Sequence, residues 1–199
     1  MAKSPKAGLV KRRLGRNIGT TAATRFARIC LAQTLTRLGA DPRWETLFAV
    51  APDSEVAAPL WSAYSRRIER LPQGAGDLGQ RMQRLFQRLP PGPVIIVGGD
   101  IPAIAACHIA KAFRLLAHAD AVIGPATDGG YWLVGLRRSP SVLAPFAKVR
   151  WSSPQALADT LKTLEGRRVA FATTLSDVDS EDGYVRLRAS WQRLIPPRS

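Results

Sequence analysis

Hydrophobic positions along the chain follow two alternating patterns. Short apolar runs of strand length occur at residues 46–51, 94–98 and 121–124, and a weaker one lies at 168–173. Longer stretches with a helical spacing of apolar residues separate these runs. This alternation predicts an α/β architecture built on a sheet.

Residues 21–38 carry the clearest helical pattern, because Ala23, Phe26, Cys30 and Leu38 fall on one face. Gly39 then suits a helix C-cap. Further helices are predicted at residues 78–89, 104–117 and 153–164. Each of the first two is entered from a turn that contains glycine or proline, and the third starts with Ser-Pro.

The length of 199 residues, with 46% hydrophobic and 22% charged content, is typical of one globular domain. The chain shows no internal repeat and no linker long enough to divide it. We therefore expect one domain over residues 1–195 and a frayed tail over residues 196–199.

The hydrophobic pattern and the cysteine spacing exclude several classes of protein. No apolar run approaches the roughly 20 residues that cross a bilayer, and the N-terminus lacks the apolar core of a secretory signal. We expect a cytoplasmic protein without a membrane span. The two cysteines, Cys30 and Cys107, form no CxxC motif, which excludes a disulfide scaffold and gives no zinc spacing.

Lysine and arginine number 29 against 15 acidic residues, for a formal charge of +14. Such a charge suits nucleic acid, an anionic surface or phosphorylated ligands. However, aromatic residues do not interleave with the arginines, and no helix-turn-helix or zinc-finger spacing is present. A basic nucleic-acid-binding module without catalysis is therefore the less favoured alternative.

The scarce carboxylates occur in short turn-like segments: Asp77 in GAGDLG, Asp100 in GGDIP, Asp128 in TDGGY, and Asp179 and Asp182 in DVDSED. The run PVIIVGGDIP places Asp100 at the end of a strand, where ligands bind in an open parallel sheet. A magnesium or manganese ion needs only one or two protein carboxylates there, and Asp179 could supply the second. A turn or a helix cap is the structural alternative for Asp100.

The start of the chain, AKSPKAGLVKRRLG, combines a flexible turn at Gly8 with the cations Lys11, Arg12 and Arg13. Lysine supplies a mobile charge and arginine a planar fork, so together they suit a diphosphate or triphosphate. The segment lacks the GxxxxGK[ST] pattern of a P-loop. It is predicted to be a phosphate cradle, with a solvated basic arm as the alternative.

The segment GPATDGGYWLVGL predicts a strand, a turn at Gly129 and Gly130, and a second strand. This arrangement would hold Asp128, Tyr131 and Trp132 near the ligand-binding edge of the sheet. A tight turn explains the two glycines equally well. Trp151 could close a pocket, or could serve as an aromatic anchor of the core.

Together these segments resemble the bacterial glycosyltransferase family associated with arsenosugar biosynthesis, within the nucleotide-diphospho-sugar transferase superfamily. The resemblance spans nearly the whole chain and rests on AKSPKAGLVKRRL, QGAGDLGQRM, VGGDIP, GPATDGGYWLVGL, WSSPQAL and DVDSED in that order. It implies a three-layer α/β/α, GT-A-like (Rossmann-like) fold with a mainly parallel central sheet. It also implies nucleotide binding by the N-terminal loop and a divalent metal near Asp100 and Asp179.

The expected activity is metal-dependent transfer of a sugar from a nucleotide diphosphate sugar to a small acceptor. The expected alternative is nucleotidyl transfer, because the same superfamily contains guanylyltransferases. The expected site residues group by role. Catalysis is assigned to Asp100 and Asp128, metal binding to Asp100 and Asp179, and substrate binding to Gly8, Lys11, Arg13, Asp77, Gly129, Gly130, Tyr131 and Trp151.

Members of the resembling family place a hydrophobic strand immediately before the segment matched by residues 2–5. The first strand is therefore expected to be truncated here. We expect either a natural start a few codons upstream or a poorly stable sheet that lacks one inner strand.

Overall fold

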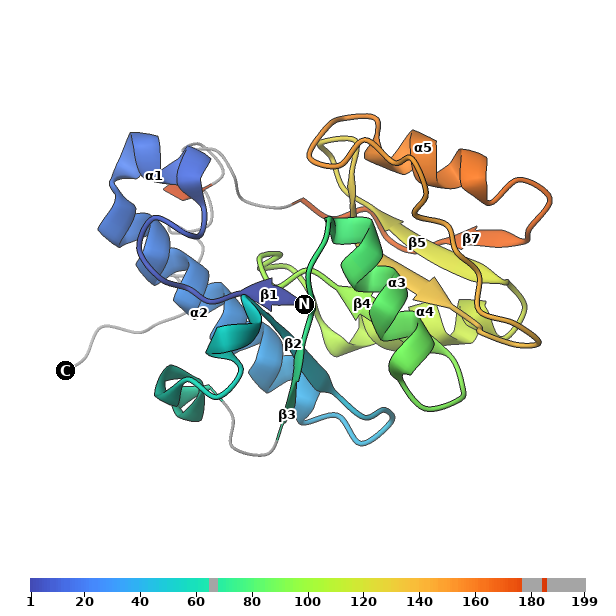
Figure 1. Cartoon of the computed structure of the whole chain (residues 1–199), viewed down its shortest axis with the longest axis horizontal. Helices are drawn as coiled ribbons and strands as arrows, with labels where there is room; N and C mark the ends of the chain where they lie inside the picture. The colour runs from blue at the N-terminus through green and yellow to red at the C-terminus, as the bar shows by residue number, and fades with distance from the viewer. Residues whose placement is uncertain (65–67, 177–183, 186–199) are drawn as a thin grey trace.

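The computed structural model describes residues 1–64, 68–176 and 184–185. Its strands form two sheets (Figure 1). The first sheet is parallel and has the order β1-β2-β3, with β1 at Ala2–Lys3, β2 at Leu47–Ala51 and β3 at Glu69–Pro72. The second has the order β4-β6-β5-β7, with β4 at Val94–Val97, β5 at Ala121–Pro125, β6 at Tyr131–Leu136 and β7 at Val169–Phe171.

The short strand β1 joins the two sheets. Ala2 pairs with Val50 of β2, and the Met1 ammonium donates a hydrogen bond of 2.8 Å to the carbonyl oxygen of Val97 at the end of β4. Only β6 runs antiparallel to its partners among the described strands, while β5 and β7 are parallel. Because β6 reverses the direction between β4 and β5, those two strands point the same way. The sheet system is therefore mainly parallel, as expected.

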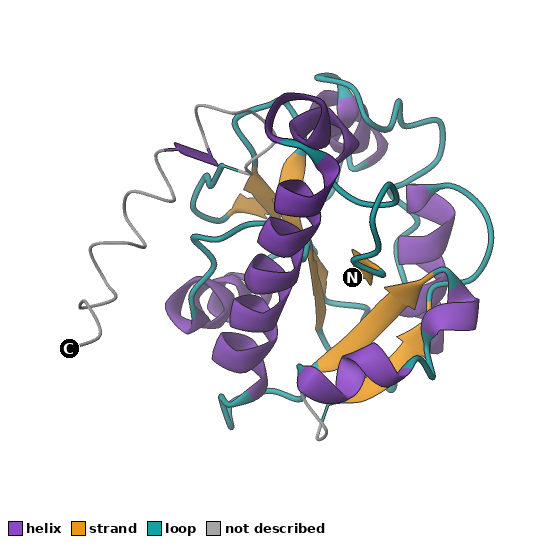
Figure 2. Cartoon of the chain, turned by 90° about the vertical axis from the view of Figure 1, so that its left-hand side faces the viewer, coloured by secondary structure: helices purple, strands orange, loops and turns teal. Residues whose placement is uncertain are grey.

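Helices cover both faces of these sheets (Figures 1 and 2). One face packs against α3 (Leu78–Arg88) and α5 (Ala156–Thr163), and the other packs against α2 (Thr20–Gly39) and α4 (Ala106–Leu116). Alternate residues of each strand point to opposite faces, so Ile123 joins the α3 side and its neighbour Val122 joins the α4 side. This is the expected three-layer α/β/α arrangement.

A fifth α-helix, α1 (Arg12–Ile18), precedes α2 and forms a hairpin with it. Leu14 of α1 is fully buried against Phe26 and Cys30 of α2. Two short 3₁₀ helices, η1 (Asp53–Glu55) and η2 (Pro59–Ala63), follow β2. None of the helices in the described ranges is long and apolar enough to cross a membrane.

The expected strands at 46–51, 94–98, 121–124 and 168–173 are confirmed as β2, β4, β5 and β7 within one or two residues. The four expected helices are confirmed as α2 to α5. Gly39, however, lies inside α2, and Ala40 is the C-cap, because Gly39 has helical backbone geometry. The sequence pattern missed α1 and β3, and the expected tail at residues 196–199 lies outside the described part of the chain.

Candidate functional site

The predicted functional segments follow strands that end at one common edge of the sheets. The basic loop follows β1, the GAGD loop follows β3, the GGD segment follows β4 and the DGG turn follows β5. Carboxyl ends of parallel strands lie at the same edge, which is where ligands bind in open α/β sheets. The topology therefore brings together segments that are distant in the sequence.

Lys11 and Asp100 meet at this edge. The Nζ atom of Lys11 lies 2.9 Å from Oδ2 of Asp100. The Lys11 side chain is only 4% exposed, whereas the Asp100 side chain is 50% exposed. Lys11 also has left-handed backbone geometry (φ 46°) as the N-cap of α1, which turns the chain into the helix. Two residues that the sequence indicated separately thus form an ion pair between a buried ammonium and a half-exposed carboxylate.

Glycine is required at the two positions before Asp100 for different structural reasons. A Cβ at Gly99 would lie 2.9 Å from the Cβ of Ala2, so β1 occupies the space that the missing side chain leaves. A Cβ at Gly98 would lie 3.2 Å from Oδ1 of Asp100, so glycine leaves room around that oxygen. Gly98 also donates its N–H to the carbonyl of Trp132 at 3.0 Å, which extends the β4–β6 pairing. Gly98 leaves space beside the carboxylate, and Gly99 allows close strand packing.

The basic loop after β1 is held by contacts that the sequence did not indicate. The Lys6 ammonium lies 2.6 Å from Glu55, whose other carboxylate oxygen accepts a hydrogen bond from the Ser4 hydroxyl at 3.3 Å. This pairing lowers the pKa of Glu55 below its usual value, chiefly through the hydrogen bond from Lys6. Arg28 of α2 donates to the carbonyl of Pro5 at 3.2 Å. The loop that leads to Lys11 is therefore tied to η1 and α2.

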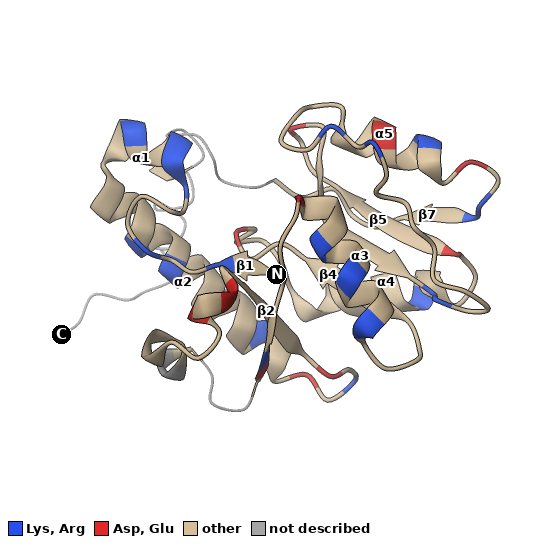
Figure 3. Ribbon diagram, viewed as in Figure 1, with Lys and Arg blue, Asp and Glu red and all other residues tan. Residues whose placement is uncertain are grey.

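The other expected phosphate-binding residues of this loop are exposed. Gly8 has a φ of 77°, and a Cβ there would meet no atom within 4 Å. Arg13 lies exposed in the first turn of α1. The blue segments on the α1–α2 hairpin are arginines, and no acidic residue lies on α1 or α2 (Figure 3). These positions leave Arg13 accessible to an anion, and its binding role stays a prediction.

The DGG turn joins β5 to β6 beside the segment that follows β7. Asp128 is exposed, and its Oδ1 accepts the N–H of Gly130 at 2.9 Å. Gly129 has a φ of 84° and packs so closely on Pro154 that a Cβ would come within 2.7 Å of its Cα. The Thr127 hydroxyl lies 3.2 Å from that of Ser176. The turn therefore presents a carboxylate at the same edge as Asp100.

Asp77 and its loop have a clear structural role. The Asp77 side chain accepts the N–H of Gln80 at 2.8 Å, and the Gln80 side chain accepts the N–H of Asp77 at 2.9 Å. This reciprocal capping box starts α3. Arg84 donates to the carbonyls of Gln73 and Ala75, which holds the loop against the helix. Asp77 remains exposed at the edge, so its expected role in substrate binding stays a prediction.

Gln73 is a residue of the site region that the sequence reasoning missed. Its side chain is buried, and its amide nitrogen donates to the carbonyls of Ala2 and Ala49 at 3.0 and 2.9 Å. It thereby ties the end of β3 to β1 and β2. The only sequence signal was its position before the GAGD loop, and that signal needed β3 to be recognised first.

Tyr131 and Trp151 lie in the packing between β6, α3 and α5. The Tyr131 hydroxyl lies 3.3 Å from the Thr160 hydroxyl, and burial raises the tyrosine pKa. Its ring meets the Trp151 ring edge to face at 6.3 Å, and Trp151 also packs on Phe146. This favours the core-anchor interpretation of Trp151, and a direct contact of either ring with substrate stays a prediction.

Asp100 can supply a ligand to a divalent cation at this edge. Asp100 offers a half-exposed carboxylate with room around Oδ1, which suits Mg²⁺ or Mn²⁺ because both prefer oxygen ligands and retain water. Within the described ranges, no group of three His, Cys, Asp or Glu side chains could hold a metal ion. Asp179, the second expected ligand, and Asp182 lie outside the described residues.

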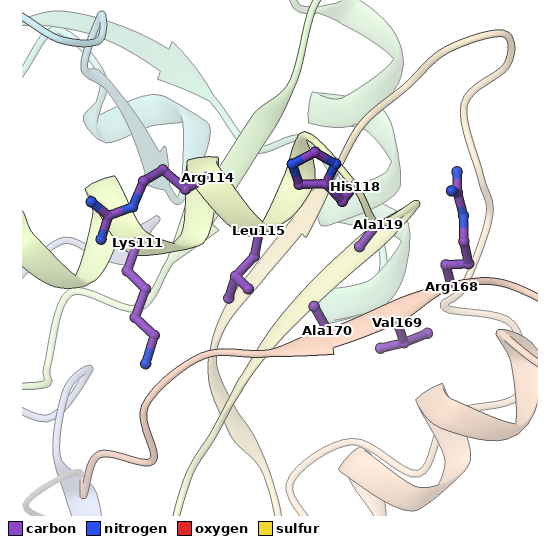
Figure 4. A pocket seen from close by; sticks show the side chains of 8 residues that line it. All are labelled: Lys111, Arg114, Leu115, His118, Ala119, Arg168, Val169 and Ala170. Atoms are coloured by element: carbon purple, nitrogen blue, oxygen red, sulfur yellow. The ribbon is translucent and has the colours of Figure 1, made fainter.

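A pocket of about 490 Å³ lies elsewhere, between the end of α4 and β7. Leu115, Val169 and Ala170 are among its apolar lining residues, and Lys111, Arg114 and Arg168 lie around it (Figure 4). In this view Arg114 and Arg168 lie on opposite sides and do not converge on one point. The pocket is lined by the last turns of α4 and the start of β7, so it is at the sheet edge opposite Asp100.

Comparison with known proteins supports a common fold and family. A family model described as "Uncharacterized protein conserved in bacteria (DUF2064)" matches residues 34–153. A crystal structure from Desulfovibrio desulfuricans G20, provisionally named a nucleotide-diphospho-sugar transferase, is 28% identical with a TM-score of 0.83. That match covers 89% of this chain and 79% of the other. A search of curated proteins gave no match.

Two more distant structures share the fold. The 4-diphosphocytidyl-2C-methyl-D-erythritol synthase of Anaerococcus prevotii DSM 20548 is 12% identical with a TM-score of 0.59, over 82% of this chain and 86% of that chain. Rv0371c of Mycobacterium tuberculosis H37Rv, solved as a manganese complex, is 14% identical with a TM-score of 0.53, over 95% and 96%. The expected GT-A-like fold is confirmed, and a manganese ion is found in a protein of this fold.

Proposed function

The chain belongs to the bacterial DUF2064 family, and from this premise we propose that it transfers a sugar from a nucleotide diphosphate sugar to a small acceptor. The observation that carries the proposal is the contact between Lys11 and Asp100 at the carboxyl edge of the strands. A phosphate-binding cation and a metal-binding carboxylate in contact suit a diphosphate leaving group. The provisional name of the similar Desulfovibrio protein supports the same class of donor.

Each residue at the edge has a distinct role in this proposal. Lys11 and Arg13 bind the diphosphate, and their positive charge stabilises the negative charge that develops as the sugar leaves. Asp100 would hold a magnesium or manganese ion, which when bound supplies further charge neutralisation to the phosphates. The manganese complex of Rv0371c supports a divalent ion in this fold, and Asp179 is proposed as a second ligand.

Asp128 is proposed to act on the acceptor. Its carboxylate is exposed and fixed by the N–H of Gly130. In the transfer, the bond between the anomeric carbon and the diphosphate oxygen breaks, and a bond from the acceptor oxygen to that carbon forms. The proton of the acceptor hydroxyl passes to the Asp128 carboxylate. Gly129 and Gly130 serve this role by shaping the turn.

The proposal extends to the identity of the acceptor. The resemblance to the family associated with arsenosugar biosynthesis makes an arsenic-containing small molecule the first acceptor to test. Tyr131 directly follows the DGG turn and packs on Trp151, so both rings are proposed to influence acceptor binding by supporting that turn.

Nucleotidyl transfer is the second candidate, supported by the fold shared with the diphosphocytidyl synthase. Here a phosphorylated small molecule attacks the α-phosphate of a nucleoside triphosphate, and pyrophosphate leaves. Lys11 and Arg13 would bind the departing pyrophosphate in the same way. The two candidates therefore differ in the product released.

Product analysis separates the two reactions. The protein is first screened by thermal shift against nucleotide sugars and nucleoside triphosphates, each with and without Mg²⁺. The stabilising ligand is then incubated with the protein and with arsenic-containing or phosphorylated small molecules as acceptors, and the reaction is followed by ³¹P NMR. Sugar transfer or slow donor hydrolysis releases a nucleoside diphosphate, whereas nucleotidyl transfer releases pyrophosphate. Stabilisation by no nucleotide, with steeply salt-dependent binding of duplex DNA, would contradict both candidates.

A further inference from the structure

The ion pair between Lys11 and Asp100 is unequal in its exposure to solvent. The Lys11 side chain is 4% exposed, and its ammonium lies 2.9 Å from Oδ2 of Asp100, whose side chain is 50% exposed. Lysine side chains are usually exposed and flexible, so a buried one is held in place by its surroundings. The ammonium of Lys11 therefore stays beside the Asp100 carboxylate.

This position affects any cation that approaches Asp100. A divalent cation that arrives without an anion meets a fixed positive charge already in contact with one carboxylate oxygen. Repulsion between like charges at such distances is substantial even at a protein surface. Because the Lys11 side chain is buried, its charge has little freedom to move away into water. Asp100 is thus poorly suited to bind a free cation.

A cation that arrives with a diphosphate is repelled less by Lys11, because the diphosphate brings negative charge with it. The phosphate oxygens are attracted by the Lys11 ammonium and by the cation at the same time, so the anion offsets the repulsion between the two positive centres. Gly98 leaves space on the Oδ1 side of the carboxylate, away from the oxygen that contacts Lys11. The same pair that disfavours a free cation therefore accommodates a cation–diphosphate complex.

We propose that Lys11 is a specificity-determining residue that makes Asp100 selective for a divalent cation already complexed with a nucleoside diphosphate group. The site would then take up the cation and the nucleotide together, and would bind free cation weakly. This inference rests on the proposed function, since it takes Asp100 as the metal ligand. It adds a role for Lys11 in excluding free cation, beyond binding phosphate.

The test compares Mn²⁺ binding by the wild type and by Lys11→Met, with free Mn²⁺ measured by electron paramagnetic resonance in the absence of nucleotide. Methionine retains the apolar length of the buried side chain and removes its charge. We expect Lys11→Met to bind free Mn²⁺ about tenfold more tightly than the wild type, because the competing charge is gone. Calorimetry with Mn²⁺–UDP and Mn²⁺–GDP should show about a tenfold loss for the nucleotide that the wild type prefers.

Two controls make the result specific. Lys6→Met removes a lysine of the same loop that contacts Glu55, so the binding of free Mn²⁺ should stay at the wild-type value. Adding Asp100→Asn to Lys11→Met should abolish the gain, because the gain requires the carboxylate. Lys11→Gln provides a second neutral variant if the methionine protein does not fold, as checked by circular dichroism.

The measurement of free Mn²⁺ binding and the measurement of Mn²⁺–nucleotide binding test different claims. Unchanged or weaker binding of free Mn²⁺ by the folded Lys11 variants would overturn the role proposed for Lys11, whatever the nucleotide result. Failure of the wild type to bind nucleotide with Mn²⁺ would instead count against the proposed function. A gain that persists in the double variant would also overturn the inference, since it would place the cation away from Asp100.

Discussion

Asp100 provides a negative charge 2.9 Å from the ammonium of Lys11, a residue far less exposed than Asp100 itself. The contact links the loop after β1 to the segment after β4, so it holds the two sheets together at their carboxyl edge. Burying a charged group is costly unless a counter-charge accompanies it. The pair therefore contributes to stability as well as to the proposed site.

Replacing Asp100 should lower the free energy of unfolding more than replacing Lys11. Asp100→Asn removes a negative charge that lies 2.9 Å from a buried ammonium, and we expect a loss of about 1–3 kcal/mol in the free energy of unfolding. Lys11→Met leaves a half-exposed carboxylate that water can solvate, so its cost should be below about 1 kcal/mol. Urea midpoints of the two variants and the wild type measure both values. An equal or larger loss for Lys11→Met would contradict this account.

Two glycines with similar backbone angles should respond differently to alanine. Gly8 and Gly129 have φ values of 77° and 84°, but only a Cβ at Gly129 would collide with the backbone of Pro154. Gly8→Ala should cost about 1–2 kcal/mol through its backbone conformation. Gly129→Ala should cost about 1–3 kcal/mol more through overpacking. Thermal or urea unfolding compares them, and equal losses would show that the DGG turn does not pack on Pro154 as described.

The strand and helix spans could be predicted because burial gave them a clear pattern. Val122 and Ile123 lie in a continuous apolar run, which is typical of a strand covered on both faces. In contrast, β3 has the sequence ERLP, with no apolar run that separates it from a loop. Likewise α1 is short, with three arginines among its seven residues, and only its burial of Leu14 against α2 reveals it. Tertiary contacts, not local pattern, define both elements.

In the candidate site, too, some features could be predicted from the sequence and others depend on tertiary contacts. Asp100 could be predicted from its place after an apolar run, and Lys11 from its basic loop. Their contact could not be predicted, because it depends on how β1 lies beside β4. The roles of Gln73 and Glu55 were also hidden, since each acts through the backbone or side chains of distant segments. Chemistry-bearing residue types are visible in the sequence, whereas the residues that position them are not.

A third prediction concerns the dependence of the free energy of unfolding on pH. Asp159 of α5 accepts two hydrogen bonds of 2.8 Å from the Arg150 guanidinium, which holds the pKa of this carboxyl well below its usual range. The stabilisation is therefore present above the unfolded-state pKa of about 3.9 and is lost as pH falls toward the folded-state pKa.

Asp159→Asn should be less stable than the wild type at pH 7, and the difference should shrink as pH falls below about 4. Urea midpoints at several pH values between neutral and strongly acidic conditions measure this convergence. A difference that is constant with pH would show that the Arg150 contact does not depend on the charge of Asp159.

Arg13 should discriminate between nucleotides with and without phosphate. Arg13→Gln removes an exposed charge from the first turn of α1, and we expect nucleoside diphosphate binding to weaken by about 1.5–3 kcal/mol while nucleoside binding is unchanged. Arg25→Gln, on the exposed side of α2, is the matched control and should leave both affinities unchanged. Equal losses for nucleoside and diphosphate would indicate a general structural defect.

Asp100 is proposed to hold a divalent cation together with a diphosphate at the carboxyl edge of the strands. The most direct measurement is the anomalous scattering of manganese in crystals grown with Mn²⁺ and the nucleoside diphosphate that stabilises the protein most. We expect a manganese peak coordinated by the Asp100 carboxylate, with the diphosphate in contact with both that ion and Lys11. A bound nucleotide whose manganese does not touch Asp100, or a peak only in the pocket between α4 and β7, would contradict it.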